Sequence, residues 1–195
     1  NTSTFSDFES KFATLEYTFN QSKRDEILFP IKTNFKIKTG IGNRNTKLFA
    51  AKQLFISTEI SHNFYLNEKN IINLKSLNGF LDSKDYLTNE LFRFGGINNV
   101  RGFNENSLQG NLFSTILTEY RYRITDNLYI NSILDYGYFR DTSNSIDGKL
   151  FSFGIGAGIL TKNGLLKLIY ANGSTSNHNR QLKNSIVHIS LSVNF

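Results

Sequence analysis

The chain of 195 residues contains no cysteine, no methionine and no tryptophan, and Pro30 is its single proline. Without cysteine, disulfide scaffolds, zinc–thiolate sites, iron–sulfur clusters and thiol catalysis are excluded. No apolar run approaches the roughly 18 residues that a membrane helix needs. Residues 1–5 have neither the basic start nor the apolar stretch of a signal peptide. Because residue 1 is not methionine, we expect the chain to be processed or to be a piece of a longer protein.

The overall composition is basic and only moderately apolar. Lys and Arg total 22 against 16 Asp and Glu, which gives a net charge of +6, and hydrophobic residues make up 39% of the chain. That fraction is too high for a disordered chain and low for a compact soluble core. The charges alternate with apolar residues instead of clustering on one helix or loop, so we expect no nucleic-acid partner.

Strict alternation of apolar and polar residues is the clearest pattern. Near the end of the chain, polar residues separate the apolar Val187, Ile189, Leu191, Val193 and Phe195. Such a period of two predicts an extended strand with one apolar face and one polar face. No segment sustains a helical period. The pattern predicts nine strands, at residues 11–20, 31–39, 53–66, 71–79, 112–124, 128–139, 151–159, 165–172 and 185–195.

The length of these strands favours a membrane barrel. Soluble strands usually run five or six residues, whereas most of these run about twice as long. Eleven residues at about 3.3 Å each, tilted by about 40°, rise roughly 28 Å, which is close to the apolar band of an outer-membrane barrel. A soluble sandwich or jelly roll with unusually long strands is the alternative.

The links between the strands alternate in length after the first hairpin. Short turns rich in Asn, Asp and Gly are predicted at residues 67–70, 125–127 and 161–164. Longer polar links are predicted at residues 42–52, 79–110, 140–149 and 173–184. Bacterial barrels place short turns in the periplasm and long loops outside, so we expect the C-terminus in the periplasm. The first link, residues 21–29, is longer than this rule predicts for a periplasmic turn.

The predicted number of strands, nine, is odd, whereas single-chain bacterial barrels have even strand numbers. An open sheet in lipid would leave an unpaired edge, at several kcal/mol per exposed backbone group. The sequence therefore indicates an all-β, transmembrane antiparallel β-barrel that is either a complete barrel of eight or ten strands or the C-terminal part of a larger one. The missing methionine favours the second interpretation.

The longest link contains the most specific motif. Residues 89–96 read NELFRFGG, and residues 100–103 read VRGF. This pair of segments resembles the BamA/TamA family of outer-membrane assembly factors and the two-partner secretion transporters. In that family, a long sixth extracellular loop folds back into the barrel and carries a Val-Arg-Gly-Phe/Tyr tip. Residues 119–122 (EYRY) and 135–137 (DYG) resemble the two strands that follow the loop.

The resemblance extends over essentially the whole chain, although it is weak in the first fifty residues. The family's loop lies between the eleventh and twelfth of sixteen strands. Here four predicted strands precede the loop and five follow it, which matches strands eight to sixteen. The resemblance thus implies one barrel segment over residues 1–195, with residues 80–110 as the extracellular loop that enters the lumen. The strand that ends in Phe195 resembles an outer-membrane targeting signal, which many unrelated barrels share.

The residues themselves support a contact between the loop tip and the barrel wall. Asp135 and Glu119 share the polar phase of their strands, so both carboxylates should face the lumen. Arg101 could grip them there, because its planar guanidinium binds carboxylates in bidentate fashion. Gly102 permits tight turning or close approach, and Phe103 completes the tip. The alternative is that Arg101 is a solvated surface arginine.

Other sets of residues carry less information. An inward basic stripe, which would steer an anionic substrate, line a pore or only keep the lumen wet, is formed by Lys32, Lys36 and Lys38. A face without side chains, which would allow curvature or close packing of the loop, is formed by Gly154, Gly156 and Gly158. Three histidines without ligand spacing, which give no reason to expect a metal, are His62, His178 and His188.

We expect no cofactor and no enzymatic activity, since no nucleophile is paired with a base and no phosphate-binding loop is present. The resemblance implies an assembly factor that folds and inserts outer-membrane proteins without ATP or covalent chemistry. Its last strand would form one side of a seam that opens to pair with an incoming strand. The expected partners are outer-membrane lipids, unfolded outer-membrane proteins and periplasmic or lipoprotein accessory subunits. A two-partner-type secretion pore, the barrel anchor of an enzyme-fused protein and a plain porin are the alternatives.

Overall fold

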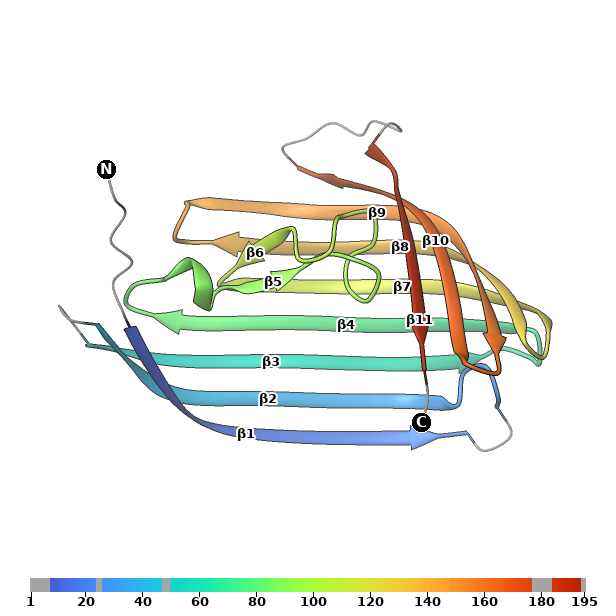
Figure 1. Cartoon of the computed structure of the whole chain (residues 1–195), viewed down its shortest axis with the longest axis horizontal. Coiled ribbons are helices and arrows are strands. Elements are labelled where there is room, and N and C mark those ends of the chain that lie inside the picture. Colours follow the sequence, from blue (N-terminus) through green and yellow to red (C-terminus); the bar gives the residue numbers. More distant parts are fainter. Residues whose placement is uncertain (1–7, 24–25, 47–49, 177–183, 194–195) are drawn as a thin grey trace.

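The computed structural model describes residues 8–23, 26–46, 50–176 and 184–193. Nine long strands form one antiparallel sheet in the order β1-β2-β3-β4-β7-β8-β9-β10-β11 (Figure 1). The prediction of nine strands in an all-β antiparallel fold is confirmed. Their bounds are β1 (Phe8–Ser22), β2 (Ile31–Thr46), β3 (Ala50–Tyr65), β4 (Asn70–Ser83), β7 (Leu112–Thr125), β8 (Leu128–Asp141), β9 (Ile146–Thr161), β10 (Gly164–Thr175) and β11 (Ile186–Ser192).

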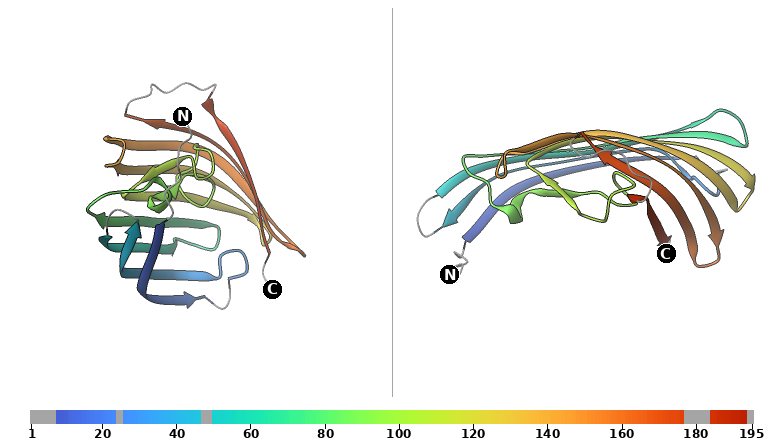
Figure 2. Two further views of the ribbon diagram at one scale, coloured as in Figure 1. Left: turned by 60° about the vertical axis from the view of Figure 1, so that its left-hand side comes forward. Right: turned by 90° about the horizontal axis from the view of Figure 1, so that it is seen from above.

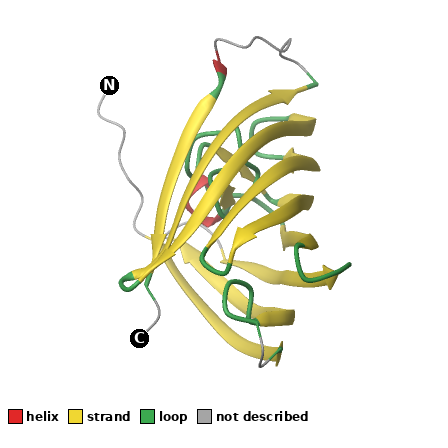
Figure 3. Cartoon of the chain, turned by 90° about the vertical axis from the view of Figure 1, so that its right-hand side faces the viewer, coloured by secondary structure: helices red, strands yellow, loops and turns green. Residues whose placement is uncertain are grey.

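The sheet is strongly curved and open, as expected for part of a barrel. Each strand pairs with its neighbours in sequence order, and β1 and β11 are the two edges within the described residues. Seen from above, the strands arch over a hollow, which we call the concave face (Figure 2). Seen from the side, they curve around the loop that joins β4 to β7 (Figure 3). In the described part of the chain, no helix is long or apolar enough to cross a membrane.

The two faces of the sheet follow the alternation in the sequence. In β8, Ile133 and Asp135 are buried on the concave face, whereas Leu134 and Tyr136 are about half exposed on the convex face. Successive side chains of a strand point to opposite faces, so a strict period of two sorts them in this way. In β11, Ile189 is 70% exposed on the convex face. Large exposed apolar side chains on one face of a sheet are the pattern of a surface that faces lipid.

Two of the four long links predicted from the sequence are wrong. β2 continues to Thr46 and β3 begins at Ala50, and β8 continues to Asp141 with β9 beginning at Ile146. Asn45 pairs with Ala50, so the ladder runs on through polar residues for which the sequence predicts a loop. Ladder hydrogen bonds join backbone groups, and once a neighbouring strand is in register they do not require an apolar side chain.

The long connection between β4 and β7 is shifted and has its own structure. Because β4 pairs with β3 as far as Ser83, the connection comprises residues 84–111 rather than 79–110. It contains the 3₁₀ turn η1 (Thr88–Glu90) and a small hairpin of β5 (Phe92–Phe94) and β6 (Leu108–Gly110). We call residues 84–111 the long loop. It turns back over the concave face (Figures 1 and 2).

The end of the sheet at which β1 connects to β2 is covered by the link between these two strands. Leu28 and Phe29 are buried there with Ile71 and Tyr129, and the rings of Phe29 and Tyr129 meet edge to face at 4.8 Å. The hydroxyl of Tyr65 donates to the carbonyl of Phe29 at 2.7 Å. We call residues 26–30 the cap. This link is longer than a turn because it folds inward and buries apolar side chains.

Candidate functional site

Two adjacent glycines reverse the long loop just before its tip. Gly95 and Gly96 have φ angles of +101° and +106°, a region that glycine adopts without steric cost. The N–H of Gly96 donates to the carbonyl of Val100 at 3.1 Å, and the N–H of Asn99 donates to the carbonyl of Gly96 at 3.1 Å. The reversal directs residues 100–103, which we call the tip, against the concave wall.

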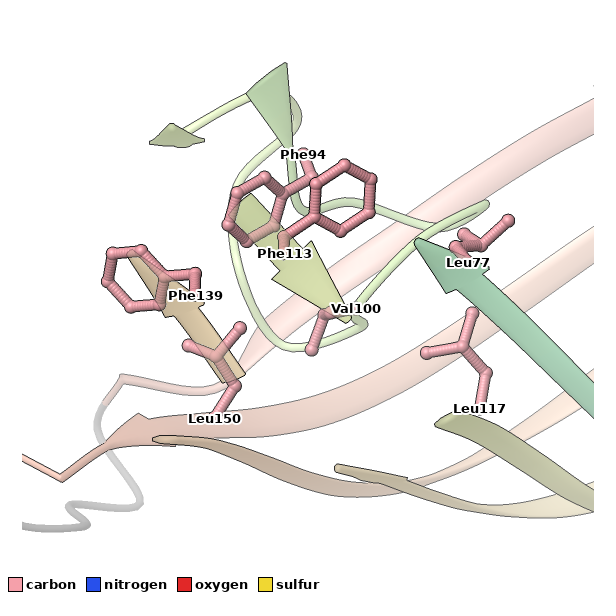
Figure 4. Packing of buried hydrophobic residues seen from close by; sticks show 7 residues of the cluster. All are labelled: Leu77, Phe94, Val100, Phe113, Leu117, Phe139 and Leu150. Atoms are coloured by element: carbon pink, nitrogen blue, oxygen red, sulfur yellow. The ribbon is translucent and has the colours of Figure 1, made fainter. Parts of the chain in front are cut away.

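An apolar cluster anchors the long loop beside the tip. Phe94 and Val100 are 1% and 0% exposed. The ring of Phe94 stacks on Phe113 at 4.8 Å and meets Phe139 edge-on at 5.8 Å. The cluster is completed by wall residues of β4, β7 and β9 (Figure 4), namely Leu77, Leu117 and Leu150. This cluster was not predicted from the sequence, although leucine and phenylalanine in the polar phase of several strands were a visible signal.

Arg101 is buried between two carboxylates of the wall. Its backbone N–H and its Nε donate to Oδ2 of Asp135 at 3.0 and 2.8 Å, and Nη2 donates to Oδ1. Nη1 donates to Oε1 of Glu119, and Nη2 also reaches the carbonyl of Thr118 at 3.4 Å. The side chains of Arg101 and Asp135 are 3% and 0% exposed. This is the bidentate geometry in which charge-assisted hydrogen bonds are strongest.

The register of β7 and β8 explains why the two carboxylates converge. Leu117 pairs with Asp135 and Glu119 pairs with Ile133, so Glu119 and Asp135 are diagonal neighbours on the concave face. Diagonal residues of an antiparallel pair lie about 7–8 Å apart, within reach of long side chains. One guanidinium, that of Arg101, spans this gap.

A second arginine balances the charge of the site. Nε of Arg121 donates to Oε2 of Glu119 at 2.6 Å, and Nη1 donates to Oδ1 of Asn63 at 3.1 Å. The guanidinium of Arg121 also lies over the ring of Phe29 at 4.5 Å. Two arginines therefore face two carboxylates, and burial of ion pairs is tolerated when each charge has a partner. Through Arg121 the network continues from the tip to the cap.

Gly102 and Phe103 bring the tip against the end of the sheet. Gly102 has a φ of +79°, and a Cβ there would lie 2.4 Å from the backbone nitrogen of Gly173 in β10. The N–H of Gly102 donates to Nε2 of His188 in β11 at 3.0 Å. Phe103 is partly buried against the apolar cluster. The tip thus contacts β8 through Arg101 and the last two strands through Gly102.

The long loop has a second ionic contact near its start. Nη1 of Arg44 in β2 donates to Oε2 of Glu90 at 2.5 Å, and the hydroxyl of Ser10 donates to Oε1 at 3.2 Å. The side chain of Arg44 is 0% exposed. The sequence predicts a loop at residue 44 and therefore does not predict this contact.

The side chains of the predicted seam residues that the structure describes point to the convex face, away from the tip. Val187, Ile189, Leu191 and Val193 are all exposed, with apolar side chains in one phase of the last strand. Phe195 and His178 lie outside the described residues. In the described part of the chain, no group of three or more His, Asp or Glu side chains could hold a metal ion.

The basic stripe and the glycine stripe have local partners. Lys36 forms an ion pair with Glu16 at 2.9 Å, so the stripe is partly neutralised by the neighbouring strand. The glycines of β9 make room for wall side chains: a Cβ at Gly158 would lie 2.3 Å from the ring of Tyr129. The nearest atoms around these glycines belong to β8 and β10, which supports close packing within the wall rather than against the long loop.

A curved antiparallel sheet with an apolar convex face, and with a long loop bound to its concave face through a buried arginine, defines a partial β-barrel of the outer-membrane type. The family model described as the Omp85 superfamily domain matches residues 3–195, and the chain belongs to this superfamily. Its members insert or secrete proteins at the bacterial outer membrane. No curated protein matches the chain. The family assignment made from the VRGF motif is confirmed.

Replacing Gly102 with alanine should displace the tip. The new Cβ would meet backbone atoms of β10 at 2.4 Å and would be forced to a φ of +79°, and strained positions of this kind cost of order 1–3 kcal/mol. Proteolysis within residues 84–111 should therefore become faster. Asn104→Ala, at an exposed position two residues further on, is the control and should leave the cleavage rate unchanged. Equal rates for both variants would contradict the close approach of Gly102.

Proposed function

We propose that this protein is an outer-membrane protein assembly and insertion factor that acts through a lateral seam beside β11. The observation that carries the proposal is the position of the tip, which contacts the wall at β7 and β8 and also the last strand. A loop that joins the middle of the wall to its edge can sense or control whether that edge is engaged. The proposal places the long loop outside the cell and the C-terminus in the periplasm.

The mechanism requires no reaction chemistry. β11 pairs with β10 over residues 186–192, and within the described residues its other edge carries no strand. Unpaired N–H and C=O groups of an edge strand can template a new strand. In lipid, where each unsatisfied backbone group costs several kcal/mol, such pairing is strongly favoured. A client strand would join this edge, and the first strand of a sixteen-stranded barrel would otherwise close it.

Arg101 serves in this proposal as a lock for the long loop. Its contacts with Asp135 and Glu119 hold the tip inside the barrel, and Gly102 and Phe103 fit the tip to the wall. The partners of the protein would be outer-membrane lipids, unfolded outer-membrane proteins and periplasmic or lipoprotein accessory subunits. None of these roles requires a cofactor, and the proposed activity is not enzymatic.

Secretion of one polypeptide through the lumen is the second candidate function. The concave wall of β1 to β4 carries alternating charges, with ion pairs of Glu16 with Lys36 and of Glu59 with Lys75 at 2.9 and 2.8 Å. A hydrated, charge-balanced wall suits passage of an unfolded chain. The lock contacts serve either function, so they do not discriminate between the two.

Depletion of the protein in its native cell separates the two functions. If it is a general assembly factor, many outer-membrane β-barrel proteins should decline together, as measured by quantitative proteomics of outer-membrane fractions. Re-expression of the unaltered protein should restore them, whereas a variant lacking residues 84–111 should not. Loss of one exported protein, with all barrel proteins unchanged, would contradict the assembly function and favour secretion.

A further inference from the structure

Among the described residues, one hydrogen bond joins the tip of the long loop to the last strand. His188 lies in the middle of β11, and its side chain is 8% exposed on the concave face. Its Nε2 lies 3.0 Å from the backbone nitrogen of Gly102. Because Gly102 follows Arg101 directly, two consecutive residues fix the tip to β8 and to β11. The contact is reinforced by the close approach of Gly102 to Gly173 on β10.

The chemistry of this bond specifies the protonation state of the imidazole. A backbone N–H can only donate, so Nε2 of His188 must offer a lone pair, and the ring is then neutral with its proton on Nδ1. An imidazolium donates at both nitrogens and would place a second N–H against that of Gly102. The bond therefore exists only while His188 is neutral.

Charged groups of both signs surround this imidazole. Glu105 and Arg101 act on it from the long loop, and Asp135 acts on it from β8. On β10, Lys167 lies two residues from Ile169, which pairs with His188. Both carboxylates of the lock, Asp135 and Glu119, already bind Arg101. They are therefore not free to neutralise a protonated His188.

We propose that His188 is a positioning residue that couples the last strand to the tip of the long loop, and that its neutral imidazole is needed for this coupling. The functional meaning rests on the proposed seam at β11. Release of the tip and loosening of β11 would then be linked events, since coupling between two sites acts in both directions. Protonation of His188 would detach β11 from a tip that Arg101 still holds.

The coupling can be measured with nitroxide labels on the full-length protein in liposomes. The chain has no cysteine, so single substitutions place a label at Asn104 beside the tip or at Val187 on the convex face of β11. A label at Ile60, on the convex face of β3, is the control. Spectra would be recorded at pH 8, where the imidazole is neutral, and at pH 4, which is low enough to protonate an imidazole whose charged form burial disfavours.

Each variant has its own expected pattern. In the unaltered protein, the mobile fraction at Val187 should rise about fivefold from pH 8 to pH 4, as expected for loss of one hydrogen bond. In His188→Leu it should be high at both pH values. In His188→Gln, whose amide oxygen can accept the bond without titrating, it should be low at both. The label at Ile60 should not respond in any variant.

The decisive variant is Arg101→Ala at pH 8. It removes the lock but leaves His188 intact, so a coupled system should show a mobile label at Asn104 and also a rise at Val187. A mobile tip with an unchanged Val187 label would overturn the coupling, as would a Val187 label that ignores pH in the unaltered protein. These measurements use no client protein, so their failure is distinct from failure of the depletion experiment.

Discussion

Arg101→Ala should release the long loop from the concave face and open it to protease. Removing the guanidinium leaves Asp135, which is 0% exposed, without its ionic partner, whereas Glu119 keeps only its contact with Arg121. Breaking a buried pair by deleting one member costs about 3–5 kcal/mol, against about 0–1 kcal/mol for a pair at the surface. A loss of that size would shift the docked loop toward the free state by a factor of hundreds or more.

Limited proteolysis with chymotrypsin measures this release without interference from the substitution. The enzyme cleaves after aromatic residues, and the long loop contains Tyr86, Phe92, Phe94 and Phe103. Arg93→Ala is the matched control, because Arg93 lies on β5 in the same loop with an exposed side chain. Cleavage should be fast in Arg101→Ala and slow in Arg93→Ala. Equal, slow cleavage of both would mean that Arg101 does not hold the loop.

Phe94→Ala should loosen the long loop to a similar extent through lost packing. The ring is 1% exposed between Phe113 and Phe139, and removal of a buried phenylalanine side chain typically costs about 3–5 kcal/mol. Hydrogen exchange at the backbone amide of Arg101, which donates to Asp135, reports the docking directly. Its protection should fall strongly in Phe94→Ala.

The control for this variant removes an equal ring from the other face. Phe80 lies on β4 with 39% of its surface exposed on the convex side, away from the long loop. Phe80→Ala should leave the exchange of the Arg101 amide unchanged. If both variants keep full protection, the apolar cluster does not contribute to docking, and the ionic contacts alone would have to hold the tip.

Much of the fold could be predicted because the period of two is itself a physical requirement. A residue that faces lipid must be apolar, and its neighbour on the concave face can be polar, so strands such as β8 and β11 are marked along their whole membrane span. The same phase argument placed Asp135 and Glu119 on one face, where the structure puts both beside Arg101. The orientation of the two carboxylates was predictable because successive side chains of a strand point to opposite faces of the sheet.

The remainder depends on contacts between distant segments. The ladder beyond Gly42 could not be predicted because its residues are polar on both faces, and only pairing with β3 reveals them as strand. His188 was considered only as a metal ligand, although its place in the polar phase of the last strand already directed it inward. The cap was signalled by an over-long link and by the apolar pair Leu28 and Phe29, but its inward course depends on Tyr65 and Tyr129.

The most direct test of the central claim is a cysteine scan along β8 in the full-length protein in liposomes. Spin labels at residues 132–138 would be assessed for collision with oxygen, which partitions into lipid, and with a water-soluble nickel complex. We expect high oxygen accessibility at Leu134 and Tyr136, and low accessibility to both reagents at Asp135, beneath the tip. Uniform accessibility to the nickel complex, or the opposite phase with Leu134 shielded and Asp135 in lipid, would contradict a lipid-embedded wall that holds Arg101 on its inner face.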